Sequence, residues 1–244
     1  MSHVADPARS FDLAAKEYEQ TRPDYPEAVL EGVPVPAGAT VLDLGAGTGK
    51  LTRVLVRRYS RVIAVEPLDG MRAILEKVVP QAASLAGRAE EIPLPDASAD
   101  AVFAAQAFHW FVTDEALTEI ARVLRGGGVF CLVWNSPDES RPWPLPQMYT
   151  DYLEELRSER SYGDRPPFGE VIARGPFGEI HEFAVAHDHV LDRQGLLDNA
   201  RSVSWIASRS SDDHRRVMRR LGRLLPQGTY SIPNMANVLW TVRS

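Results

Sequence analysis

The sequence has few of the features that mark secreted, membrane or nucleic-acid-binding proteins. Its single cysteine, Cys131, excludes an intramolecular disulfide and is typical of a buried thiol in a strand. No apolar run is long enough to cross a bilayer, and the N-terminal stretch MSHVADPARS lacks the apolar core of a signal peptide. The net charge of −6 disfavours non-specific binding to nucleic acid or to anionic membranes. We therefore expect a cytoplasmic protein with no membrane or nucleic-acid partner.

Residues 40–135 alternate between apolar and amphipathic segments. Apolar side chains recur at helical spacing in the amphipathic segments, which are therefore expected to be helices. Continuous apolar strands separated by such helices predict an α/β fold, with a parallel sheet covered on both faces. The expected strands are 41–44, 61–66, 84–89, 99–105 and 129–134, and the expected helices are 49–59, one that starts at Asp69 and stops at Pro80, and one that starts at Thr113 or Asp114 and ends at Gly126–Gly128.

The two ends of the chain follow another pattern. The N-terminal region closes with the proline-rich link RPDYP, and prolines cluster again after Trp134. A stripe of arginines on the last expected helix lies opposite apolar residues, which is typical of a solvated face. The elements expected in these regions are helices over 10–20 and 147–160, strands over 180–191 and 236–242, and a helix that begins near 210–213.

The stretch VLDLGAGTGK places three glycines, Gly45, Gly47 and Gly49, directly after the first expected strand. A phosphate-binding P-loop has four residues between its first glycine and the Gly-Lys pair, followed by Ser or Thr, and this loop meets neither requirement. A dinucleotide-binding loop, G-x-G-x-x-G, would require glycine at position 50, which is Lys50. The loop therefore favours a nucleoside without a diphosphate.

Asp43 lies two residues before the first glycine of this loop. A carboxylate there would repel a pyrophosphate and attract a cationic ligand, and S-adenosylmethionine carries positive amino and sulfonium groups. Its carboxylate can meet backbone N–H groups or a helix N-terminus. We expect the three glycines to let the backbone approach this ligand, since a Cβ atom would displace it. The alternative is a glycine turn that serves packing alone.

Glu66 ends the second expected strand, 21 residues after Gly45. An acid in this place can accept hydrogen bonds from both hydroxyl groups of a ribose. The feature suits NAD as well as S-adenosylmethionine, and an exposed acid at a strand end is the structural alternative. Glu66 thus supports a ribose without choosing between the two cofactors.

Four segments in this order, VLDLGAGTGKLT, VIAVEP, AEEIPLPDASADAVFAAQAFHWF and ALTEIARVLRGGGVFCLVW, resemble successive motifs of class I S-adenosylmethionine-dependent methyltransferases, in particular the methyltransferase type 11 group. FDLAAKEYEQTRPDYP is similar to the leading cap segment of a small-molecule subgroup that includes trans-aconitate methyltransferase. The resemblance implies a Rossmann-like, mostly parallel seven-stranded sheet of order 3-2-1-4-5-7-6, with the seventh strand antiparallel, helices on both faces and a helical cap. We expect a single domain made of an N-terminal cap (1–38), a cofactor-binding core (39–136), and substrate-cap insertions with the last two strands (137–244).

The resemblance also implies which residues hold S-adenosylmethionine, the expected cofactor. They are Tyr18 and Arg22 in the cap, Asp43, Gly45, Ala46 and Gly47 along the methionine part with Thr48 and Gly49 in the same loop, Glu66 at the ribose, Pro67 and Met71 beside the adenine, Ala89 and Glu90 at the adenine edge, and Gln106 after the fourth strand.

Methyl transfer from a sulfonium is an in-line displacement, so the protein mainly positions the reactants and excludes water. A carboxylate acceptor is already ionised at neutral pH, whereas a phenol or an amine calls for a base. The candidate base is His109, with a role in the pocket wall as its alternative. The residues expected to form the substrate pocket are Phe108, His109, Trp110 and Trp143, and the candidate anchors for an anionic substrate are Arg22, Arg141, Arg201 and Arg209.

His187 and His189 alternate along one expected strand, but no further ligands follow at a suitable spacing, so no metal site is expected. We predict a methyltransferase that acts on a small-molecule acceptor, at a carboxylate or hydroxyl oxygen. The alternatives are an NAD-dependent oxidoreductase on a similar fold, methylation of a macromolecule, and a binding module without turnover. The segment AAQAFHW after the fourth strand lacks the Asn/Asp-Pro-Pro-aromatic tetrad used to methylate exocyclic base nitrogens.

Overall fold

A computed structural model of the chain describes residues 19, 21–158 and 167–244. The expected helix over 10–20 and Tyr18 lie outside these residues, apart from 19. The described residues form two compact units. The sheet unit contains residues 24–136, 167–187 and 235–244, and the helical unit contains residues 19, 21–23, 137–158 and 188–234.

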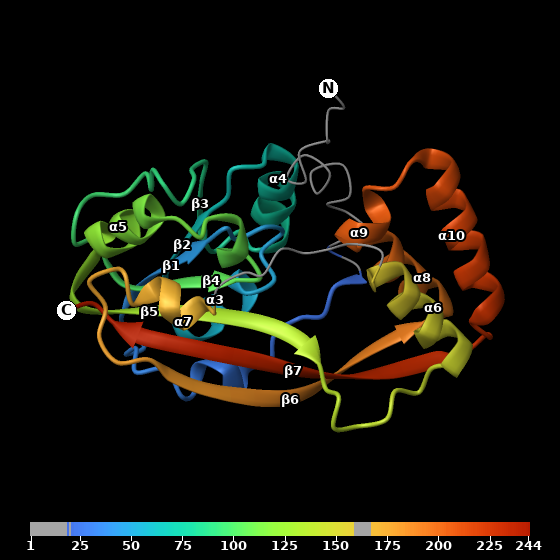
Figure 1. Cartoon of the computed structure of the whole chain (residues 1–244). Helices are drawn as coiled ribbons and strands as arrows, with labels where there is room; N and C mark the ends of the chain where they lie inside the picture. The colour runs from blue at the N-terminus through green and yellow to red at the C-terminus, as the bar shows by residue number, and fades with distance from the viewer. Residues whose placement is uncertain (1–18, 20, 159–166) are drawn as a thin grey trace. The chain divides into compact units, whose positions relative to one another are not determined.

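The sheet has seven strands in the order β3-β2-β1-β4-β5-β7-β6. The pairs from β3 to β5 are parallel, and β7 runs in the opposite direction (Figure 1). Both the order and the antiparallel seventh strand confirm the expected fold. The strands are β1 (Thr40–Leu44), β2 (Arg61–Val65), β3 (Ala83–Leu85), β4 (Ala99–Ala105), β5 (Leu124–Pro137), β6 (His181–Asp192) and β7 (Thr229–Val242).

Helices cover both faces of this sheet, as the apolar strands predicted. Alternate side chains of a strand point to opposite faces, so Cys131 and Val133 of β5 join one hydrophobic cluster while Phe130 and Leu132 join another. The cluster that contains Cys131 is covered by η1 (Glu27–Leu30) and α3 (Thr52–Arg58). The other is covered by α5 (Asp114–Val123) and α7 (Phe168–Ile172). The described part of this unit also contains α4 (Asp69–Val78) and the short helix η2 (Phe108–Trp110).

The glycines 126–128 do not end a helix, contrary to the prediction from the sequence. Helix α5 begins with Thr113 as its cap, as predicted, but ends at Val123, and β5 begins at the next residue. The backbone of the glycine run pairs with Arg243, because the N–H of Gly127 donates to its carbonyl and the carbonyl of Gly128 accepts from its N–H. Strand pairing with a distant residue thus replaces the helix C-cap expected of glycine.

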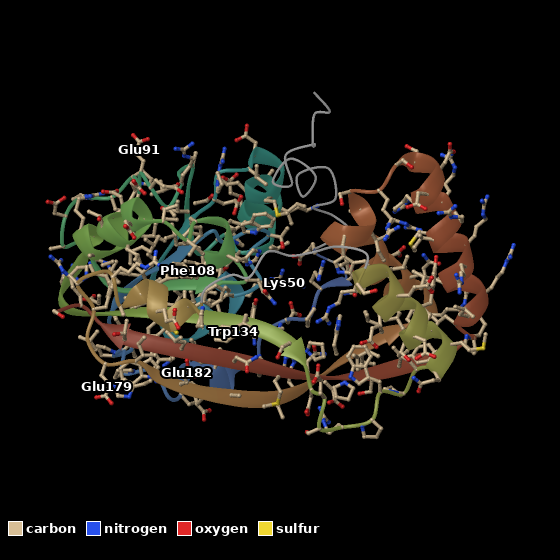
Figure 2. The ribbon with its side chains drawn as sticks, viewed as in Figure 1. Lys50, Glu91, Phe108, Trp134, Glu179 and Glu182 are labelled. Atoms are coloured by element: carbon tan, nitrogen blue, oxygen red, sulfur yellow. The ribbon has the colours of Figure 1, made fainter. Side chains whose placement is uncertain are left out.

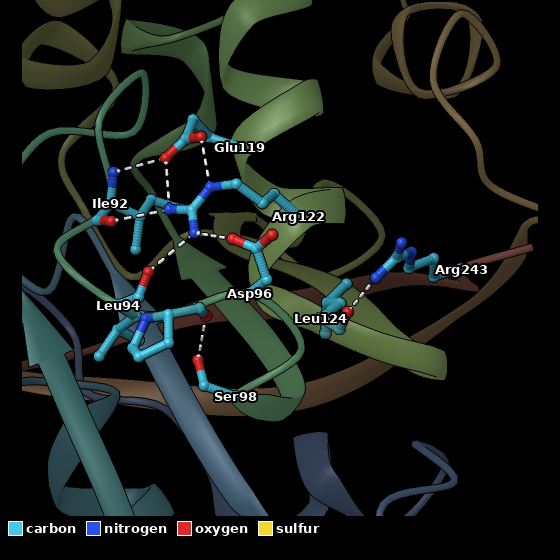
Figure 3. A network of polar contacts seen from close by, with 9 residues as sticks. Ile92, Leu94, Asp96, Ser98, Glu119, Arg122, Leu124 and Arg243 are labelled. Atoms are coloured by element: carbon cyan, nitrogen blue, oxygen red, sulfur yellow. Dashed lines mark hydrogen bonds and ion pairs between the residues drawn. The ribbon is translucent and has the colours of Figure 1, made fainter.

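Arg122 of α5 fixes the loop that follows β3 (Figure 3). Its guanidinium donates to the carbonyls of Ile92 at 3.0 Å and Leu94 at 2.9 Å, and it forms ion pairs with Asp96 and Glu119 at 2.7 Å each. Glu119 also accepts from the N–H of Ile92 at 2.9 Å. Its hydrogen bond to Arg122 holds the pKa of Glu119 below its usual value. The loop is therefore tied to the helix by both backbone and side-chain contacts.

The helical unit has its own hydrophobic core, with Tyr149, Ile206 and Leu221 at its centre. Ser210 caps α10 through the N–H of Asp213, in agreement with the predicted helix start. The arginines of α10 are exposed, while Val217 and Leu221 on its other side are buried. No helix in the described parts of the chain has the length and apolarity needed to cross a membrane. The helices of this unit are α6 (Gln147–Ser158), α8 (Arg193–Ser202), α9 (Ser204–Ala207) and α10 (Ser211–Leu224).

Candidate active site

The glycine loop lies where the order of the parallel strands reverses, between β1 and its neighbours β2 and β4. Ligands of open α/β sheets bind at this switch point, outside the carboxyl ends of the strands. The amides of Gly45 and Ala46 both donate to the carbonyl of Val65, at 2.8 and 3.1 Å. These bonds hold the start of the loop against the end of β2, so the loop and Glu66 share one edge of the sheet.

The three glycines of the loop all have positive φ, but for different reasons. At Gly45, with φ of +69°, a Cβ atom would come within 2.7 Å of the Ala107 side chain. At Gly49, with φ of +90°, it would meet Leu75 at 3.2 Å. Packing within the protein therefore already accounts for these two glycines, and their approach to a ligand stays a prediction.

At Gly47, unlike Gly45 and Gly49, no close packing contact excludes a Cβ atom. Its φ is +57°, and the nearest atom to an added Cβ is the sulfur of Met71 at 3.7 Å. Its N–H donates to Oε2 of Glu66 at 2.8 Å. The structure thus brings together Gly47, Glu66 and Met71, three of the residues predicted to contact the cofactor.

Glu66 is 5% exposed and is held from two directions. One carboxylate oxygen accepts from the N–H of Gly47, and the other accepts from the N–H of Leu68 at 2.9 Å. These two hydrogen bonds fix the orientation of the carboxylate at the end of β2. Pro67 lies between Glu66 and Leu68, directly before the first turn of α4.

Asp43 is completely buried on β1. Burial raises its pKa to about 7, the hydrogen bond from the Thr52 hydroxyl at 2.6 Å opposes this, and the negative charge of Glu66 raises it further. The other oxygen, Oδ1, is buried without a hydrogen-bond partner in the described structure, and so is the hydroxyl of Thr48. Unsatisfied buried polar atoms are uncommon, so these two atoms fit a site that receives a polar, positively charged ligand.

The residues predicted at the adenine edge lie in the loop that Arg122 secures. Ala89 is 4% exposed and belongs to the same hydrophobic cluster as Val65 at the end of β2. Glu90 lies 4.0 Å from the guanidinium of Arg88. Both residues follow β3, whose end lies beside the end of β2 at the same edge of the sheet.

Gln106 follows β4 with a φ of +49°, which is unusual for a residue other than glycine. Its N–H donates to the carbonyl of Val133 and its side-chain amide donates to the carbonyl of Asn135, at 2.9 and 2.8 Å. These bonds to β5 hold the residue in a conformation that costs about 1–3 kcal/mol. Backbone strain of this kind is concentrated at functional sites.

The aromatic residues after Gln106 have different surroundings. Phe108, labelled in Figure 2, is 2% exposed. It packs edge-on against Phe130 and against Phe168 of α7, with ring centroids 5.7 and 5.3 Å apart, and so contributes to the core. Trp110 is 46% exposed, and its ring centroid lies 4.7 Å from that of half-buried His109.

The candidate residues of the helical unit make contacts within that unit. Trp143 packs against its hydrophobic core, and Arg22 donates to the carbonyl of Ser202. The other candidate anchors form ion pairs with neighbouring aspartates, so an anionic substrate would have to compete with them. These pairs join Arg141 to Asp138 and Asp188, Arg201 to Asp198, and Arg209 to Asp213, at 2.6–2.8 Å.

Two further polar groups make contacts that the sequence motifs do not predict. His187 lies 2.9 Å from the side-chain oxygen of Asn135 at the end of β5. Lys50, which the sequence shows only as a mismatch to phosphate-binding loops, pairs with Asp24. Neither contact can be predicted from neighbouring residues in the sequence, because each joins residues from distant parts of the chain. The described residues contain no group of three or more potential metal ligands.

Comparisons with known proteins agree on one family. The profile of the methyltransferase domain matches residues 42–132. An uncharacterized methyltransferase of Mycobacterium tuberculosis is 38% identical over 220 residues, which cover 90% of this chain and 87% of that protein. The malonyl-acyl carrier protein O-methyltransferase of Methylococcus capsulatus is 36% identical over 130 residues, 49% of this chain and 47% of that protein.

The fold also resembles that of solved methyltransferase structures. A proposed type II methyltransferase from Anaeromyxobacter dehalogenans superimposes with a TM-score of 0.61 at 24% identity, over 91% of this chain and 97% of that one. The sheet order and the glycine loop at its switch point thus define an enzyme of the Rossmann-like methyltransferase class. The chain belongs to the class I S-adenosylmethionine-dependent methyltransferases, and its cofactor is S-adenosylmethionine. This membership sets aside the NAD-dependent oxidoreductase considered from the sequence.

Proposed function

We propose that the enzyme transfers the methyl group of S-adenosylmethionine to an oxygen atom of a small molecule, either a carboxylate or a hydroxyl. The observation that carries the proposal is the segment after β4, which presents Gln106, His109 and Trp110 where a base-methylating enzyme has its Asn/Asp-Pro-Pro-aromatic tetrad. The similarity to an enzyme named as an O-methyltransferase points in the same direction.

The cofactor contacts follow from the polar groups at the edge of β1 and β2. Glu66, which the N–H groups of Gly47 and Leu68 hold in place, would accept the ribose hydroxyls. The unpartnered oxygen of Asp43 would face the positive charge of the methionine part, and Met71 would lie beside the adenine. The bound cofactor supplies the activated methyl group. The remaining predicted contacts are proposed on the resemblance alone; they are Tyr18, Arg22, Gly45, Ala46, Thr48, Gly49, Pro67, Ala89, Glu90 and Gln106.

The acceptor would meet the enzyme beyond the end of β4. Trp110 is exposed there beside His109, so an apolar wall and an imidazole are available to an acceptor. A carboxylate with a pKa near ~4 needs no base, and His109 would then act as a wall. A hydroxyl acceptor would donate its proton to a base, and His109 is the candidate for this role. Trp143 is proposed as a substrate-pocket residue on the sequence alone.

The proposal is tested by the chemical stability of the product. The purified protein is incubated with S-adenosylmethionine labelled in the methyl group and with pools of small carboxylic acids, phenols, alcohols and amines. Label that mild base releases as methanol identifies a methyl ester, while label that resists base and stays on oxygen identifies an ether. Transfer only to amines, or only to added RNA or protein, would contradict the proposal.

A second comparison separates the two kinds of oxygen acceptor. With a carboxylate substrate, His109→Gln should leave the pH dependence of kcat unchanged, because no proton is removed. With a hydroxyl substrate, the same variant should lower kcat by roughly 10²–10⁴-fold, the usual contribution of a positioned base.

A further inference from the structure

Lys50 directly follows the last glycine of the cofactor loop and makes an ion pair outside the proposed cofactor contacts. Its ammonium lies 2.9 Å from Oδ1 of Asp24, and Arg53 approaches the same oxygen at 3.6 Å. The side chain of Lys50, labelled in Figure 2, is only 9% exposed, whereas that of Asp24 is 67% exposed. A nearly buried ammonium is costly without a partner, so Asp24 stabilises Lys50 in this place.

Asp24 is itself fixed by a second contact. The side-chain amide of Asn135, near the end of β5, donates to the backbone carbonyl of Asp24 at 3.4 Å. The oxygen of the same amide lies 2.9 Å from Nε2 of His187 on β6. Pro23 restricts the backbone directly before Asp24. The backbone of Asp24, whose carboxylate Lys50 contacts, is therefore tied to the end of β5.

The ion pair acts at the carboxyl end of the glycine loop. The N–H of Gly49 donates to the carbonyl of Ala46 at 2.9 Å, which closes the turn, and Lys50 is the next residue. A restraint on Lys50 therefore also restrains the turn that carries Gly47, whose N–H holds the carboxylate of Glu66. A loop held in its binding conformation loses less conformational freedom when a ligand arrives.

We propose that Lys50 is a positioning residue for the cofactor loop: through its ion pair with Asp24 it holds the loop in the conformation that binds S-adenosylmethionine. The proposal rests on the placement of the cofactor contacts in this loop. It explains why lysine follows the last glycine although no diphosphate is bound.

The two partners of the pair are expected to respond unequally to substitution. Asp24→Asn leaves a nearly buried ammonium beside Arg53 without a carboxylate. Lys50→Met leaves an exposed carboxylate that Arg53 still approaches. The first variant should therefore weaken cofactor binding more than the second, and adding Lys50→Met to Asp24→Asn should recover part of the loss.

The experiment is a calorimetric titration of the full chain with S-adenosylhomocysteine. Lys50→Met is expected to raise the Kd about 5–30-fold, in the range of an ion pair with one buried partner. Lys50→Arg should stay within about threefold of the wild type, because it keeps the charge. The matched control is Arg57→Met, which removes the 2.7 Å pair with Glu27 at the far end of α3, the helix that follows Lys50, where both side chains are exposed. The control should bind like the wild type.

An unchanged Kd in Lys50→Met overturns the proposal, and so does an equal rise in Arg57→Met. A loss of thermal stability without a change in Kd also overturns it, since the pair would then serve folding alone. The titration needs no methyl acceptor, so an error in the proposed acceptor chemistry leaves it unaffected. If the wild-type protein does not bind S-adenosylhomocysteine, the proposed cofactor contacts are wrong. This outcome is distinct from a failure of the ion-pair proposal, in which the wild type binds and Lys50→Met binds equally well.

Discussion

Asp43 is a carboxyl group whose charge depends on what lies beside it. Burial raises its pKa from 3.8 to about 7. The folded protein therefore favours the protonated form, and the stability that this group contributes falls as the pH rises from about 4 to about 7. A positive ligand charge beside the unpartnered oxygen would favour the ionised form instead. Cofactor binding and proton release are thus expected to be linked at this residue.

This linkage predicts the pH dependence of cofactor affinity. Between about pH 5.5 and 7.5, S-adenosylmethionine should bind more tightly as the pH rises, and binding near pH 6 should release a proton. Calorimetry in buffers of different ionisation enthalpy measures that proton. Asp43→Asn should abolish the release and flatten the affinity profile. S-Adenosylhomocysteine, which lacks the sulfonium charge, is the control ligand and should show a shallower profile. Equal profiles for wild type and variant would remove Asp43 from the cofactor site.

Single residues also show where sequence reasoning reaches its limit. The acids Asp43 and Glu66 could be selected from the sequence, because their distances from the glycines along the chain are fixed by the strand–turn–helix pattern. The reason for Gly45 could not, since the atom that excludes a Cβ belongs to Ala107, after β4. Asp24, the ion-pair partner of Lys50, could not be predicted for the same reason. Contacts between distant segments leave no local pattern.

Among the elements, the loop after β3 depends most on one side chain. Arg122 makes two hydrogen bonds to the backbone of this loop and pairs with Asp96. It also pairs with Glu119, which accepts a hydrogen bond from the N–H of Ile92. The side chain of Arg122 is 29% exposed and that of Glu119 is 19% exposed, so water competes only partly for these bonds. The loop that carries the proposed adenine-edge residues is thus held by α5.

Arg122→Met is expected to lower the free energy of unfolding by about 1–3 kcal/mol, because it leaves partly buried acceptors without their donor. Hydrogen exchange should increase across residues 88–98, and the Kd of S-adenosylhomocysteine should rise. Arg125→Met is the matched control. It removes the more exposed pair with Asp100, which keeps its hydrogen bond from the N–H of Thr40, and one hydrogen bond to the carbonyl of Ser98 at the end of the loop, and should cost less than about 1 kcal/mol. A larger effect in the control would show that the loop is not held by Arg122.

The elements of the sheet differ in how well the sequence predicts them. Strands β1, β2 and β4 are continuous apolar runs, so their existence and nearly all of their bounds could be predicted. The start of β5 could not, because glycines after a helix usually signal a helix end, whereas here their backbone groups pair with Arg243. The order of the strands came from the resemblance to a family, since periodicity alone does not specify which strands are neighbours.

At the scale of the whole molecule, a ligand that binds only the folded state must raise its stability. S-Adenosylhomocysteine at 100 times its Kd should add ~2.7 kcal/mol, which for a chain of this size corresponds to roughly 5–10 °C in Tm. NAD at the same concentration should leave the Tm unchanged. The negative charge of Asp43 disfavours a diphosphate, and position 50, where a dinucleotide-binding loop requires glycine, is a lysine. Scanning calorimetry of the full chain measures both.

Two alanine variants connect this shift to the glycine loop. Gly47→Ala should fold, at a cost of about 1–2 kcal/mol for its positive φ, because an added Cβ meets only Met71 at 3.7 Å. It should lose the shift with S-adenosylhomocysteine, since the methyl group would occupy the space proposed for the ligand. Gly45→Ala should instead lower the Tm without ligand much further, because its Cβ would collide with Ala107. A full ligand shift in Gly47→Ala, or a shift with NAD in the wild type, would contradict the placement of the cofactor against this loop.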